Sequence, residues 1–141
     1  MLIHIWMCFH KKNKEGIIEF ILIEGKTQDE VLELKQSCDI YIDQIHNRGG
    51  WGYGMNSVES LAMGLVCLTE LVEEYRKFIP DHPFVMITKD SLRKTILYLI
   101  QNKEILLKKK IESRDWVLKY HSISSVAKSL YSHYEEKSWI K

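Results

Sequence analysis

The chain has 141 residues, 45% of them hydrophobic and 11% aromatic, which is enough for one hydrophobic core and too little for two ordinary domains. Twenty Lys and Arg residues against nineteen Asp and Glu residues give a net charge of +1, so no overall field would gather nucleic acid or an anionic membrane. We therefore expect one domain over residues 1–141, no nucleic-acid partner, and a function that depends on a local site.

The three cysteines, Cys8, Cys38 and Cys67, lie far apart in the sequence. They lack the close pairing of zinc ligands or redox motifs, so we expect no metal site and a reduced, cytoplasmic compartment. The apolar run over residues 1–9 is about half as long as a bilayer span, and no basic residue precedes it as in a signal peptide. It predicts a buried strand and no transmembrane segment.

Short apolar runs alternate with amphipathic segments along the chain. Thr27 followed by Glu30 is a capping box, which predicts a helix through about residue 36. Gly64 is placed to end a helix that begins near residue 55, and Asn102 is expected to cap a helix through residue 120. The predicted strands are 2–9, 17–23, 39–45, 65–69 and 84–87, and two more helices are predicted at 92–100 and 123–134. This alternation predicts an α/β fold: a Rossmann-like parallel sheet flanked by helices, with a helical C-terminal third.

The connection over residues 11–16 is too short for the helix that normally links two parallel strands. Either the first two strands pair as an antiparallel hairpin, or this chain lacks a crossover helix. The sequence leaves both alternatives open.

A glycine-rich turn separates the strand that ends near residue 45 from the helix that begins near residue 55. Glycine permits backbone conformations and close approaches that a Cβ would prevent, and the first amides of the next helix are unpaired donors. A diphosphate fits such a helix start without a metal ion. The alternative is a flexible loop that needs glycine only for its turns. The glycines are Gly49, Gly50, Gly52 and Gly54.

Glu59 lies one turn into the helix that follows. Its carboxylate is placed to accept hydrogen bonds from the two hydroxyls of a ribose whose phosphates lie at the helix start. Asn56 and Glu59 also have the spacing of a capping pair, in which Glu59 would serve only the backbone of Asn56. Physical reasoning from the sequence leaves these two roles open.

Residues 24–134 resemble the C-terminal, donor-binding domain of family-4-like glycosyltransferases of the two-domain GT-B kind. The resemblance rests on CDIYIDQ at 38–44 and GYGMNSVESLAMG at 52–64. Members of that group have a strand with a polar end, a Gly-aromatic-Gly turn, and a helix reading Glu-x-Met/Leu-Ala-x-Gly. The order VESLAMG over residues 58–64 follows this pattern.

The resemblance implies that the chain binds a nucleoside-diphosphate sugar and transfers its hexose only together with a second, acceptor-binding domain. It implies that Glu59 binds the ribose and that the turn binds the diphosphate, with no cofactor and no metal. Trp51 and Tyr53 are expected to be exposed and to contact the other domain. The implied donor-binding residues are Gly52, Tyr53, Gly54, Met55, Asn56, Ser57 and Glu59, and Lys11, Lys12 and Lys14 are the implied cations for the diphosphate.

Two other functions compete with this one. Family members often carry a second glutamate, eight positions before the first, that reaches the transferred sugar, but Trp51 occupies that position here. This departure favours a non-catalytic Rossmann-like module that at most binds nucleotide. The spacing Gly52-x-Gly54-x-x-Ser57, with Glu70 after the next strand, partly matches the dinucleotide fingerprint and offers an NAD-type oxidoreductase.

Overall fold

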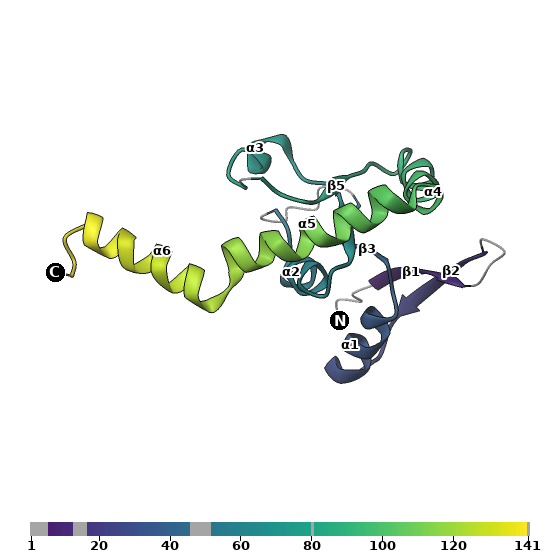
Figure 1. Ribbon diagram of the computed structural model, residues 1–141, viewed down its shortest axis with the longest axis horizontal. Coiled ribbons are helices and arrows are strands. Elements are labelled where there is room, and N and C mark those ends of the chain that lie inside the picture. Colours follow the sequence, from purple (N-terminus) through teal and green to yellow (C-terminus); the bar gives the residue numbers. More distant parts are fainter. Residues whose placement is uncertain (1–5, 13–16, 46–51, 80, 141) are drawn as a thin grey trace.

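A mixed five-stranded sheet organises the chain, with strand order β2-β1-β3-β4-β5 (Figure 1). The computed structural model describes residues 6–12, 17–45, 52–79 and 81–140. The elements in chain order are β1 (Trp6–Lys12), β2 (Ile17–Ile23), α1 (Gln28–Gln36), β3 (Ile40–Ile42), α2 (Met55–Ala62), β4 (Val66–Thr69), α3 (Glu73–Arg76), β5 (Val85–Met86), α4 (Leu92–Gln101), α5 (Lys103–His121) and α6 (Ile123–Glu136).

The first two strands form an antiparallel hairpin, in which Trp6 lies opposite Ile23 and Lys12 lies opposite Ile17. This pairing decides between the two alternatives that the short 11–16 connection left open. β1 also pairs antiparallel with β3, where Met7 lies opposite Ile42. The hairpin thus extends one side of the sheet without a crossover helix.

The remaining three strands run parallel to one another. Ile40 of β3 lies opposite Val66 of β4, and Leu68 lies opposite Val85 of β5. Helix α2 connects β3 to β4, and the four-residue helix α3 lies in the connection from β4 to β5. The predicted α/β class and helical C-terminal third are confirmed, with a parallel sheet limited to three strands.

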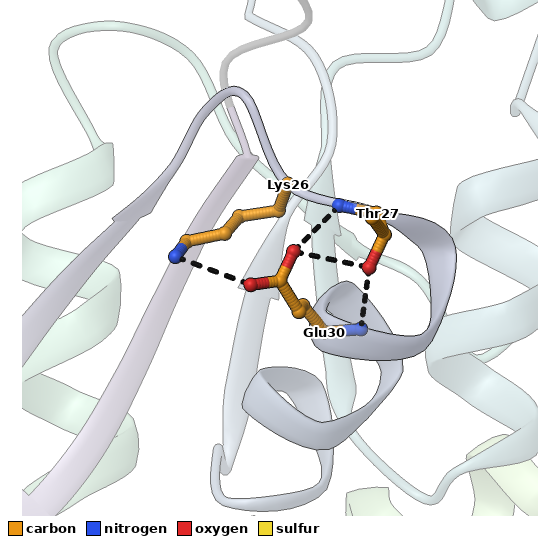
Figure 2. Close-up of polar contacts among 3 residues, drawn as sticks. All are labelled: Lys26, Thr27 and Glu30. Atoms are coloured by element: carbon orange, nitrogen blue, oxygen red, sulfur yellow. Dashed lines mark hydrogen bonds and ion pairs between the residues drawn. The ribbon is translucent and has the colours of Figure 1, made fainter.

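Local signals in the sequence set the ends of α1 and α2. The Thr27 hydroxyl accepts the Glu30 N–H, and the Glu30 carboxylate accepts the Thr27 N–H at 2.8 Å, as the predicted capping box requires (Figure 2). Lys26 lies 3.6 Å from the same carboxylate. After α2, Gly64 adopts a φ of +77°, which an L-residue with a Cβ rarely takes.

The parallel part of the sheet is covered on both faces, because its strand residues alternate between two hydrophobic clusters. Tyr41 and Cys67 pack on one face with side chains from α1, α2 and α5, among them the buried Trp116. The other face holds Ile40, Ile42, Val66 and Leu68 of β3 and β4, together with Ile96 and Leu99 of α4.

Two details differ from the sequence-based expectation. Helix α3 was not predicted, because four residues are too few to show helical periodicity. Asn102 does not cap α5 with its side chain. Its Nδ2 group donates to the Tyr98 carbonyl of α4 at 2.7 Å, since Asn102 is also the C-cap of the preceding helix.

Helix α6 continues from α5 and extends away from the sheet (Figure 1). None of its residues is buried, and Val126, Leu130 and Tyr131 are about half exposed. Within the described ranges, no helix is both long enough and apolar enough to cross a membrane.

Candidate functional site

The carboxyl ends of β2, β3 and β4 lie at the same edge of the sheet. Ile23 at the end of β2 pairs with Trp6, and Ile42 at the end of β3 pairs with the adjacent Met7. The starts of α1 and α2 and the segment with α3 therefore all leave the sheet from this edge. Ligands of open α/β sheets bind in crevices at such an edge.

The turn at Gly52 is tied to the ends of two parallel strands. The Gln44 side-chain amide donates to the Gly52 carbonyl at 2.9 Å and to the Glu70 carbonyl at 3.3 Å. The Glu70 N–H in turn donates to the Gln44 carbonyl at 3.0 Å. Gly52 has a φ of +96°, so this position requires glycine. Gly49, Gly50 and Trp51 lie outside the described residues.

Helix α2 begins with Gly54 as its N-cap, and no side chain in the described structure bonds to its first amides. The Ser57 N–H donates to the Gly54 carbonyl at 3.0 Å, as expected for a first helical turn. Met55 presents an 83% exposed side chain. The backbone N–H groups of Met55 and Asn56 therefore lie at a positively polarised helix end, where Gly54 and Met55 are exposed residues.

Ser57 holds this helix start against the sheet. Its fully buried hydroxyl donates to Asp43 Oδ2 at 2.6 Å, and Cys67 Sγ lies 3.6 Å from the same hydroxyl. Burial raises the pKa of the Cys67 thiol, and the neighbouring Asp43 charge adds to that effect. Ser57 is therefore a structural residue of the turn, and it brings a carboxylate to within reach of Gly54.

Glu59 contacts two residues of α1. Its Oε1 atom lies 2.5 Å from Lys35 Nζ, and its Oε2 atom accepts a hydrogen bond from Gln28 Nε2 at 2.9 Å. The suggestion that Glu59 caps the backbone of Asn56 is therefore wrong, because the N-cap is Gly54 and the carboxylate is held by α1. The Glu59 side chain keeps 27% of its surface exposed.

Sequence reasoning missed Lys35 and Gln28. A signal for Lys35 was present, since Val31, Lys35 and Cys38 have the i, i+4, i+7 spacing of a buried helix face. Lys35 lies on that face with its side chain fully buried.

Tyr53 is partly buried and packs against the hydrophobic core. Its ring lies 5.0 Å from that of Phe84 and 5.6 Å from that of Trp116, and its hydroxyl is 3.1 Å from His121 Nε2. Burial raises the pKa of the Tyr53 phenol and lowers the pKa of the His121 side chain. Tyr53 is therefore partly buried by these aromatic side chains, and not fully exposed as expected for a residue that contacts another domain.

The hairpin register places Lys11 and Lys12 far from the glycine turn. Met7 lies opposite Ile42 at the ligand edge, and Lys12 is five residues further along β1, which corresponds to roughly 17 Å. The structure therefore does not bring these two lysines to the turn, and Lys14 lies outside the described residues.

Tyr75 of α3 lies near the turn, since a Cβ on Gly52 would be 4.0 Å from the Tyr75 Cβ atom. Arg76 and Lys77 follow Tyr75 directly, and Arg76 donates to Glu73 at 2.7 Å. A pocket of about 420 Å³ is lined by Arg76, Lys77 and His82, together with Glu73, Ile79 and Asp81. Burial lowers the pKa of His82, and the charges of Arg76 and Lys109 lower it further.

Across the described part of the chain, no group of three or more His, Cys, Asp and Glu side chains is arranged to hold a metal ion. Comparisons with protein-family models, with curated proteins and with solved structures returned no match.

Proposed function

We propose that this chain is the Rossmann-like, nucleotide-sugar-binding half of a two-domain glycosyltransferase, and that it binds the donor at the turn from Gly52 to Asn56. One observation carries the proposal. The glycine turn leads from the carboxyl end of a parallel strand into a helix whose first amides have no side-chain cap. Glu59 follows one turn later, as in the family that the sequence resembles.

The diphosphate would lie against the start of α2. Backbone N–H groups at a helix N-terminus bind phosphate oxygens, and the helix dipole favours the negative charge. Arg76 at the end of α3 and Lys77, which follows it, would supply positive charge in place of Lys11 and Lys12, because the adjacent Tyr75 lies near Gly52. Transfer of the hexose leaves charge on the departing nucleoside diphosphate, which these donors would stabilise.

The ribose would bind to Glu59. A carboxylate has about four acceptor positions, and Lys35 and Gln28 account for two of them. The remaining positions and the exposed part of the side chain allow Glu59 to accept both hydroxyls of a ribose.

A non-catalytic module that at most binds nucleotide is the second candidate. The Asp43 carboxylate favours it, since Asp43 Oδ1 is 4.0 Å from the position of a Cβ on Gly54 and would repel a diphosphate. Trp51, in the place of the family's sugar-binding glutamate, favours it too.

Calorimetric titration of the chain with UDP, GDP and ADP tests the proposal, and NAD and inorganic pyrophosphate are titrated for comparison. We expect one of the three diphosphates to bind with a Kd below about 1 mM, and more tightly than pyrophosphate. Tighter binding of NAD would favour the oxidoreductase alternative. A folded sample that gives no heat with any ligand at millimolar concentration would leave the non-catalytic module as the better account.

A further inference from the structure

Lys35 is an unusual residue for the interior of a helix–sheet interface. Its side chain has no exposed surface, its Nζ atom lies 2.5 Å from Glu59 Oε1, and it sits 5.0 Å from the centre of the Tyr41 ring. Removing an ammonium group from water costs several kcal/mol, and an apolar pair of similar volume often replaces a buried ion pair with no loss of stability. A lysine at this position therefore calls for an explanation beyond packing.

The carboxylate partner is held at both oxygen atoms by one helix. Lys35 binds Oε1, and Gln28, one residue into α1, donates to Oε2 at 2.9 Å. Two contacts on opposite oxygens fix the carboxylate plane, which a single ion pair would leave free to rotate. The pair is also asymmetric, because Lys35 is fully buried while Glu59 keeps 27% of its side-chain surface exposed. The free acceptor positions of the carboxylate therefore belong to its exposed part.

We infer that Lys35 and Gln28 are positioning residues, which hold the Glu59 carboxylate so that its exposed acceptor positions receive both hydroxyls of a vicinal cis-diol. This inference rests on the proposed function and specifies its ligand: a ribonucleotide, in preference to a 2′-deoxyribonucleotide. A 2′-deoxy ligand has one hydroxyl fewer for the fixed carboxylate, and a buried or oriented acceptor left without its donor lowers affinity.

The test compares the affinities of UDP and 2′-deoxy-UDP, or the matching pair for whichever base binds most tightly, in the wild type and two variants. Lys35→Met removes the buried ammonium group, and Gln28→Leu removes the amide of an exposed residue, which is expected to affect stability little. Gln36→Leu, an exposed glutamine on the same helix, is the matched control. Thermal melting establishes whether each variant is folded. If Lys35→Met does not fold, the comparison of Gln28→Leu with Gln36→Leu remains the test.

We expect the wild type and Gln36→Leu to prefer the ribose form about tenfold, the factor expected for one hydrogen bond to a charged group. Lys35→Met and Gln28→Leu should lose most of that preference, while their affinity for the deoxy form changes little. If both folded variants bind the two ligands more weakly by the same factor, the preference for the ribose form is unchanged. The contacts then serve only to hold α1 against α2, and the inference fails. Equal binding of both ligands by the wild type would also overturn it, with the proposed function intact, whereas no binding at all would overturn both.

Discussion

Glu59 is a residue of the candidate ligand site and also the partner of the buried Lys35. Glu59→Gln removes the negative charge next to a lysine that has no exposed surface. We expect the free energy of unfolding to fall by about 1.5–3 kcal/mol, the range for hydrogen bonds to charged groups. Sequence reasoning did not identify this lysine of α1 as the partner of Glu59. Urea unfolding monitored by circular dichroism measures the change.

The matched control is Glu33→Gln on the exposed surface of α1, which should change stability by less than about 0.5 kcal/mol. Nucleotide affinity of Glu59→Gln, measured well below its melting temperature, should also fall. Full stability of Glu59→Gln would show that the Lys35 contact contributes nothing to the fold.

The free energy of unfolding is expected to depend on pH through His121. Burial lowers its pKa below the ordinary value of about 6.5, so the unfolded chain takes up a proton more readily than the folded chain. Stability contributed by the neutral form is therefore present above about pH 6.5 and declines as the pH falls through that value. His82 shifts in the same direction.

We expect urea midpoints of the wild type to decrease between about pH 7.5 and 5.5, the range in which histidines titrate. His121→Gln keeps a polar group near the Tyr53 hydroxyl and removes the titration, so its midpoint should decrease less over the same range. A steeper decrease in the variant would contradict the assignment.

The proposed ligand binding depends on the start of α2. Gly54 has φ −85° and ψ 169°, which any residue can adopt, and an added Cβ would meet no atom closer than 4.0 Å. Gly54→Asp places a carboxylate on the amides proposed to bind phosphate. We expect its affinity for a nucleoside diphosphate to fall at least tenfold, with the free energy of unfolding within about 1 kcal/mol of the wild type.

Gly54→Asn is the isosteric neutral control and should weaken binding much less. Calorimetry on both variants provides the comparison. Equal affinities for the two variants would place the ligand away from this helix start.

Elements with local signals could be predicted from the sequence, and features that depend on distant residues could not. Thr27 and Glu30 are three residues apart, so their capping box was predicted correctly and appears in full (Figure 2). The burial of Tyr53 depends on Phe84 and Trp116, which lie far along the chain. The remote position of Lys11 and Lys12 likewise depends on a pairing that the short connection left open.

In the proposed enzyme, this chain provides the donor side of the site and a facing domain would provide the acceptor side. Transfer of a sugar requires an acceptor aligned with the donor carbon and shielded from water, which a facing domain provides in the GT-B arrangement. We expect the isolated 141-residue chain to bind donor and to transfer no sugar. An assay of donor turnover tests this expectation. It is run on the pure chain and again with added lysate of the source organism, which would supply an acceptor-binding partner.

Activity that appears only with lysate would support the proposal that the chain is one half of a two-domain enzyme. Transfer to an added acceptor by the pure chain would refute it, and no turnover in either sample would favour the non-catalytic module.

The proposed function depends most directly on the binding of a nucleoside diphosphate at the turn from Gly52 to Asn56. Amide chemical-shift mapping of the isotope-labelled chain, titrated with UDP, GDP and ADP, tests it residue by residue. We predict saturable shifts at Gly52, Gly54, Met55 and Asn56 and at the backbone of Glu59, with little change in the β1–β2 hairpin. Saturable shifts confined to another surface, or none at millimolar ligand, would contradict binding at this turn.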